Sequence, residues 1–288
     1  MGKRNDKCKY PNNIEKRELS FHLYLNPSFK KQFIRMYDVL ADNHSRNYKA
    51  VYERLKNHTE DVQNEFKEQA ENMLKGNYMS EYSDYGDYME EVRDYVYERL
   101  DEQFLMHYQF ELMSLSNLYQ VFEQQLRKWL YEEMTHNENE GINQVEFIHV
   151  NEKNESAYNK FYGDFGKLTE VLTELKLTFT DLFGYEELIV ETDIWKTIRE
   201  CNLLSNTYKH GSGHSAENLY NLYPDYFKKV LSSSTRLMDM YRTTNLERVL
   251  NVDKISFEKY SNAMKEFWEN MKEHQRGKVM MKINISSE

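Results

Sequence analysis

The sequence predicts an all-α protein in which long helices form a bundle. The chain of 288 residues holds only ten glycines and three prolines, so it lacks the frequent turn residues that an all-β or α/β chain requires. Apolar residues make up 40% of the chain, which is enough for a buried core. They recur at spacings of three and four over long stretches, and this is the period of an amphipathic helix.

The first helical stretch is expected over residues 28–76, as one long or broken helix without a proline. Ser28 is suited to cap its start, and Gly76 is suited to follow its end. A second helical stretch is expected over residues 80–134. It opens with a tyrosine stripe, which we interpret as a core or interface face rather than a base-stacking platform; its members are Tyr78, Tyr82, Tyr85 and Tyr88.

Residues 135–155 lose the helical period, and they predict a loop with at most a short strand over residues 145–150. Helical patterns resume over residues 156–184, 191–210 and 253–275. The last residues, 276–288, are expected to be a loose tail or a short strand. We therefore divide the chain into an acidic N-terminal helical region (1–100), a helical bundle (101–275) and the tail (276–288).

The net charge of −10 is concentrated in one part of the chain. Residues 37–160 hold twelve Lys or Arg against twenty-six acidic residues. This balance disfavours non-specific binding to duplex nucleic acid, which needs a broad basic surface. Five cations between Lys228 and Arg248 form either a local basic groove or, as we expect, scattered solvated charges.

The sequence predicts a cytoplasmic protein that has no membrane span. No window approaches eighteen consecutive apolar residues, and the first residues are polar. Cys8 and Cys201 match no metal-binding or redox spacing, so reduced thiols are expected. No cofactor and no metal ion are expected.

The helical stretch 191–210 carries a polar stripe that consists of Arg199, Asn202, Asn206 and His210. At 100° per residue the stripe faces away from the apolar residues of the same helix, and its members are close enough to contact one shared ligand. Two interpretations stay open. The stripe is part of an active site, or Lys209 and His210 simply end a helix that Gly211 follows. His210 and His214 also have metal-ligand spacing, but the glycines between them break the helix.

Residues 193–227 and 255–271 resemble the C-terminal signature of a group of bacterial proteins in the HEPN (higher eukaryotes and prokaryotes nucleotide-binding) superfamily. Residues 114–134 are similar to the first core helix of that group, with Phe122 and Glu123 in its Phe-Glu motif. The resemblance covers roughly residues 105–275. The matching residues of the C-terminal signature are Asn206, Lys209, His210, Gly211, Ser215, Pro224, Asp225, Phe227, Phe267 and Trp268.

The resemblance implies a bundle of four to five helices, often dimeric, which in many members cuts RNA without a metal in toxin and phage-defence systems. It implies that His210 acts as acid or base, that Asn206 positions the phosphate or the imidazole, and that Lys209 or Arg199 stabilises the transition-state charge. Glu123 would orient His210 from a facing helix.

The sequence departs from the Arg-x(4 to 6)-His motif of the nucleases. Leu203, Leu204 and Ser205 stand where the arginine would be, and ten residues separate Arg199 from His210. Two functions are therefore predicted. The first is a metal-independent ribonuclease acting through His210. The second is a non-catalytic HEPN-like module that binds nucleotide, or a protein partner such as an antitoxin, through its acidic N-terminal helices. A homodimer is expected for both.

Overall fold

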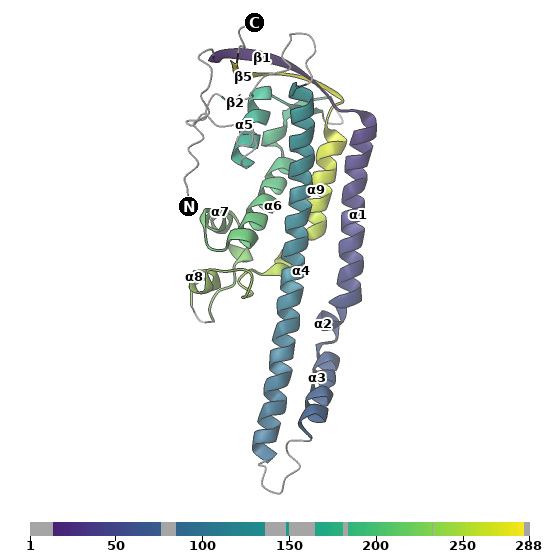
Figure 1. Cartoon of the computed structure of the whole chain (residues 1–288), viewed down its shortest axis with the longest axis vertical. Helices are drawn as coiled ribbons and strands as arrows, with labels where there is room; N and C mark the ends of the chain where they lie inside the picture. The colour runs from purple at the N-terminus through teal and green to yellow at the C-terminus, as the bar shows by residue number, and fades with distance from the viewer. Residues whose placement is uncertain are drawn as a thin grey trace, which may run out of the picture. The chain divides into compact units, whose positions relative to one another are not determined.

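The computed structural model describes residues 14–75, 85–135, 148–149, 165–180, 184–231 and 233–284. Most of them are helical, which confirms the predicted all-α class (Figure 1). The helices are α1 (Pro27–Val51), α2 (Glu53–Asn57), α3 (Thr59–Leu74), α4 (Tyr85–Thr135), α5 (Phe165–Leu175), α6 (Asp193–His210), α7 (His214–Leu222), α8 (Leu237–Tyr241) and α9 (Phe257–Asn270). The strands are β1 (Ile14–Tyr24), β2 (Ile148–His149), β3 (Thr178–Thr180), β4 (Glu186–Leu188) and β5 (His274–Asn284).

The chain divides into two compact units. Unit 1 holds the described residues up to 34, those of 121–199 and those from 263 onward, and unit 2 holds those of 35–120 and 200–262. The unit boundary falls inside α1, α4, α6 and α9, so each unit contains a part of each of these helices. The predicted boundaries at residues 100 and 275 rest on composition and resemblance, and they stay predictions.

Several predicted helices differ from the observed ones in extent. The first stretch is broken into α1, α2 and α3, and its cap is Asn26, whose Oδ1 accepts a hydrogen bond from the Ser28 amide at 2.8 Å. Ser28 is therefore not the cap, because Pro27 already occupies the first helical turn. Of the helix predicted over residues 156–184, residues 156–164 lie outside the described residues, and the part after Leu175 is wrong. There α5 is followed by Lys176 in the left-handed conformation (φ 53°), and β3 begins two residues later.

In unit 1, β1 and β5 form an antiparallel ribbon, with Leu19 opposite Val279, and β2 pairs with the other edge of β5 (Figure 1). Leu19, Phe21 and Leu23 alternate with exposed residues along β1, so one face of the ribbon is buried. The strand β1 was not predicted, whereas the strand alternative for the last residues is confirmed. A side chain at Gly277 would overlap the backbone of Leu175, which shows how closely β5 passes over the end of α5.

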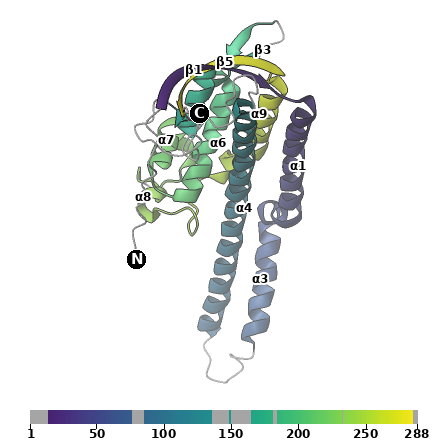
Figure 2. The ribbon, with the colours of Figure 1, turned by 45° about the horizontal axis from the view of Figure 1, so that its top comes forward.

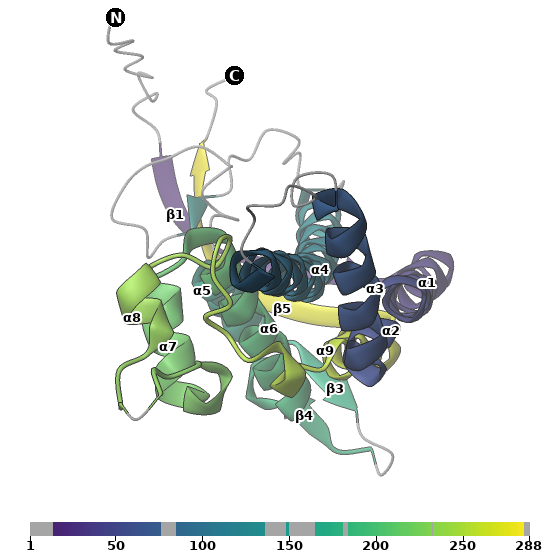
Figure 3. The same cartoon turned by 90° about the horizontal axis from the view of Figure 1, so that it is seen from below.

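Aromatic side chains form the core of unit 1. Trp268 on α9 packs edge-to-face on Trp129 of α4, with ring centroids 6.1 Å apart, and Phe165 of α5 stacks on Trp195 of α6 at 4.8 Å. Phe267 contacts Phe122 edge-to-face at 5.0 Å. Beside this core, β3 and β4 pair as a short hairpin (Figures 2 and 3). The Phe-Trp pair in the predicted closing helix is thus a packing element.

Unit 2 is held together by buried polar links between its helices as well as by apolar packing. Ser116 Oγ on α4 lies 3.0 Å from Ser205 Oγ on α6, and both side chains are buried. In this unit, α3 runs beside the N-terminal half of α4 (Figures 1 and 2), where Leu55, Val62 and Leu100 form an apolar cluster. Figure 3 shows α7 and α8 next to each other.

The predicted tyrosine stripe is only partly described. Tyr85 is 75% exposed and Tyr88 is half-buried, while Tyr78 and Tyr82 lie outside the described residues. The core interpretation is therefore wrong for Tyr85. Tyr85 and Tyr88 lie at the start of α4, and the apolar contacts of this helix with α3 come instead from Val96 and Leu100.

Candidate functional site

The stretch from Asn206 to Gly211 is the end of α6. The helix ends at His210, and the amide of Gly211 donates to the carbonyl of Thr207 at 2.9 Å. Gly211 has φ 65°, and a Cβ atom there would overlap the carbonyl oxygen of Arg242. Glycine is required on both grounds, so the interpretation of this stretch as a helix end accounts for Gly211.

The predicted polar stripe does not lie wholly on an open face. Asn202 is only 6% exposed, Asn206 is half-buried, and Lys209 and His210 are exposed in the last turn. The expectation that all four stripe residues face away from the core is therefore wrong for Asn202. Arg199 is exposed but lies nearly three turns before His210. The helix brings Asn206, Lys209 and His210 into one turn and leaves Arg199 apart.

Glu123 belongs to unit 1, whereas His210 belongs to unit 2. Within α4, Glu123 Oε1 accepts a hydrogen bond from Arg127 Nη2 at 2.6 Å. Part of its charge is thus already neutralised in its own helix. The predicted role of Glu123 in orienting His210 stays a prediction.

Two of the five cations between Lys228 and Arg248 are paired with carboxylates. Arg236 holds Asp239 at 2.6 Å and Glu217 at 2.9 Å, and Arg248 is paired with Asp101. These ion pairs fit the interpretation as scattered charges. Among the residues that the structure describes, no three His, Cys, Asp or Glu side chains are placed to hold a metal ion.

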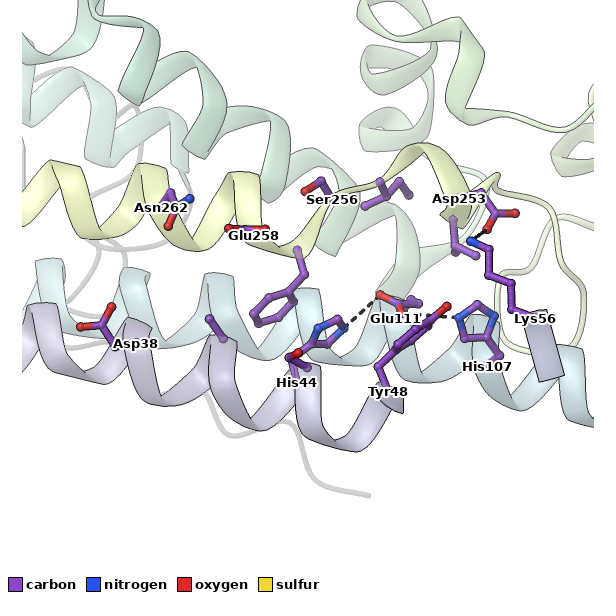
Figure 4. Close-up of a pocket in the computed structure, with 15 residues that line it drawn as sticks. Asp38, His44, Tyr48, Lys56, His107, Glu111, Asp253, Ser256, Glu258 and Asn262 are labelled. Atoms are coloured by element: carbon purple, nitrogen blue, oxygen red, sulfur yellow. Dashed lines mark hydrogen bonds and ion pairs between the residues drawn. The ribbon is translucent and has the colours of Figure 1, made fainter. Parts of the chain in front are cut away.

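A second polar cluster in unit 2 has the geometry of a site. The carboxylate of Glu111 lies between two imidazoles: His44 Nε2 is 3.0 Å from Oε2, and His107 Nε2 is 3.5 Å from Oε1 (Figure 4). His107 and Glu111 are one turn apart on α4, and His44 comes from α1. Only 13–14% of each of these side chains is exposed.

Aromatic rings hold both imidazoles in place. His44 is sandwiched between Phe257 and Phe110, with ring centroids at 4.1 and 5.1 Å and interplanar angles of 3° and 12°. His107 lies against Tyr48 at 5.6 Å and Tyr52 at 5.3 Å. Because packed rings cannot rotate freely, the two imidazoles keep a fixed orientation toward Glu111.

Glu111 remains ionised because of its two neighbours. Burial alone raises the pKa of its carboxyl, but the hydrogen bonding and charge of His107 and His44 outweigh burial and lower the pKa to about 2. His44 makes the closer contact. At 3.5 Å, His107 Nε2 is buried without a well-formed hydrogen bond, so we assign the shift mainly to His44.

The cluster lies on the wall of a cavity of about 620 Å³. Four carboxylates line it against one ammonium group, that of Lys56, which donates to Asp253 Oδ1 at 2.8 Å. The complete lining consists of Asp38, Ala41, His44, Ser45, Tyr48, Lys56, His107, Glu111, Val252, Asp253, Ile255, Ser256, Phe257, Glu258 and Asn262. All of these residues belong to unit 2. The arrangement is suited to bind a ligand of positive charge.

Only the His107–Glu111 part of this cluster can be recognised in the sequence. The spacing of His107 and Glu111 is that of side chains one helical turn apart, which is visible in the sequence. His44 precedes Glu111 by 67 residues, and only the packing of α1 on α4 brings the two together. The sequence therefore predicted a site within residues 191–210 and not at His44, His107 and Glu111.

Among the described residues, no helix has both the length and the apolar character needed to cross a membrane. Comparison with protein-family models, with curated proteins and with solved structures returned no match for this chain. The HEPN resemblance therefore stays a prediction based on the residues that carry it.

Proposed function

We propose that this chain is a non-catalytic HEPN-like module of a bacterial toxin or phage-defence system, which works in the cytoplasm as a homodimer and binds a basic protein partner. The observation that carries the proposal is the structure of the helical turn in which catalysis was predicted. Gly211 has a left-handed φ and packs against the carbonyl of Arg242, so this turn is the end of a helix. Arg199 lies nearly three turns before His210. This geometry favours the binding module over the nuclease.

The acidic helices of unit 2 are the proposed docking surface. Five acidic side chains and one lysine lie on α3, and residues 85–120 of α4 hold eight acidic side chains and two arginines. Such an excess of one charge attracts a partner of opposite charge and raises the rate of association. A basic protein or peptide is therefore the partner that this surface fits.

A binding experiment with a basic probe tests the docking surface. We would titrate a Lys/Arg-rich peptide of about twenty residues, long enough to span several helical turns, into wild type and into a Glu60→Gln/Glu68→Gln variant of α3. Both glutamates are exposed, so folding should be retained. The matched control is Glu266→Gln/Glu269→Gln on α9, which removes the same charge from unit 1. We expect weaker binding only for the α3 variant; an equal loss in both variants would contradict the proposal.

The second candidate function is the metal-independent ribonuclease. It is favoured by the exposure of Lys209 and His210, which leaves an imidazole and an ammonium group accessible to an RNA phosphate. On this alternative, His210→Ala and Lys209→Ala abolish RNA cleavage while the protein stays folded. Lys196→Ala is the matched control, because Lys196 is exposed on the same helix and donates a hydrogen bond to the exposed Asp193.

A further inference from the structure

We infer that the cavity beside Glu111 binds an organic cation, a primary ammonium or guanidinium group carried by a linear amine or by a basic side chain. This inference is independent of the role of His210, because the cavity and the end of α6 share no residue. It rests on the charge of the lining, on the aromatic and hydroxyl groups of the wall, and on the length of the cavity.

The charge of the lining selects a cation. His44 and His107 both face Glu111, and even with both imidazoles charged the four carboxylates of the lining would outnumber its three cationic groups. The other carboxylates of the lining are those of Asp38, Asp253 and Glu258. With a single lysine against four carboxylates, an anionic ligand such as a phosphate would be repelled.

The protein itself places an ammonium group against this wall. Lys56 Nζ donates to Asp253 Oδ1 at 2.8 Å, which is the kind of contact that a ligand amine would make with the Glu258 carboxylate. Tyr48 adds a half-buried aromatic side chain to the lining, and a cation is attracted to the face of such a ring. The hydroxyls of Ser45 and Ser256 can accept hydrogen bonds from N–H groups.

The cavity is elongated. Along α1 its lining extends from Asp38 to Tyr48, which is roughly 15 Å at the helical rise. In Figure 4, Asp38 and the Lys56–Asp253 pair lie toward opposite ends, with Glu111 between them. Carboxylates spread along such a groove match an extended chain with more than one cationic group, or a long basic side chain, better than a compact ion.

Calorimetric titration at low salt tests the inference with two probes. Spermidine represents a free linear amine, and N-acetyl-arginine amide represents a guanidinium group on a protein; N-acetyl-citrulline amide is its neutral counterpart. We expect one site per chain for a cationic probe and no binding of the citrulline derivative. Because spermidine carries more positive charge than the arginine derivative, each probe is compared with itself between wild type and the variants below; the probe whose binding depends on the cavity carboxylates identifies the source of the cation.

Variants then locate the site. Asp38→Asn/Glu258→Gln should weaken binding about tenfold or more, because charged hydrogen bonds to the ligand are lost. Both side chains are exposed, so the variant should fold, and thermal unfolding confirms it. The control is Glu266→Gln/Glu269→Gln, which removes the same charge from exposed positions of α9 in unit 1, outside both the cavity and the proposed docking surface. Equal weakening in both variants, or no binding of either cation at millimolar concentration, would overturn the inference.

Discussion

Glu111 is the residue whose substitution tests the site geometry most sharply. The pKa of Glu111 is about 2 in the folded protein, against an ordinary value of 4.5. The ionised form of this side chain is therefore more stable in the folded protein than in the unfolded chain. At about 1.4 kcal/mol per pKa unit, the shift corresponds to about 3 kcal/mol of unfolding free energy at pH 7. Glu111→Gln removes this contribution, because the neutral amide does not ionise and carries no charge for the imidazoles to stabilise.

The pH dependence follows from the sign of the shift. A carboxyl with a lowered folded-state pKa stabilises the protein above its unfolded pKa, and this stabilisation is lost as the pH falls toward the folded-state value. The difference in unfolding free energy between wild type and Glu111→Gln should therefore shrink from about 3 kcal/mol at pH 7 to about 1 kcal/mol at pH 3.

Urea unfolding followed by circular dichroism at both pH values measures this difference. Glu102→Gln is the control, because Glu102 is an exposed residue of the same helix paired with exposed Arg99 at 2.9 Å. We expect it to change stability by less than about 1 kcal/mol at either pH. A Glu111→Gln deficit that is the same at both pH values, or no larger than that of the control, would refute the assignment of the shift to His44 and His107.

Three other substitutions test further parts of the structure. Gly211→Ala should destabilise the protein by about 3 kcal/mol, because it meets both a left-handed φ and a carbonyl oxygen; Gly184→Ala, with φ 85° and open space, should lose only about 1–2 kcal/mol in the same urea experiment. Trp268→Ala removes a side chain from the core of unit 1 and should lower the free energy of unfolding by about 4 kcal/mol, whereas Tyr185→Ala at a 75% exposed position should change the midpoint of urea unfolding little. Burial raises the pKa of Glu200, but hydrogen bonds from one lysine and two tyrosines outweigh it and lower the pKa, so the deficit of Glu200→Gln should diminish as the pH falls below the ordinary carboxyl range; a deficit independent of pH would contradict this.

Helical periodicity was sufficient to predict the class and most of the long helices. The apolar repeat is strongest in α4, α6 and α9, because each of these helices buries one face along several turns. The strand β1 was missed because its alternation covers only Leu19, Phe21 and Leu23, and because its partner β5 lies some 250 residues along the chain. Such long-range pairing leaves little local signal in the sequence.

The candidate site was less predictable than the fold. Gly211 could be interpreted correctly as a helix end, because that role depends on local backbone conformation. The burial of Asn202 was not predictable from helix geometry alone, since it depends on what packs against that face of α6. The same holds for His44 and Glu111, which only the fold of unit 2 brings together.

Cleavage of RNA by the purified protein tests the proposed function most directly. We would incubate labelled RNA with wild type and with His210→Ala in the presence of a chelator, after confirming by thermal unfolding that both proteins are folded. The binding-module account predicts intact RNA with both proteins. Cleavage by wild type that is lost in a folded His210→Ala variant would contradict it and establish the turn from Asn206 to His210 as an active site.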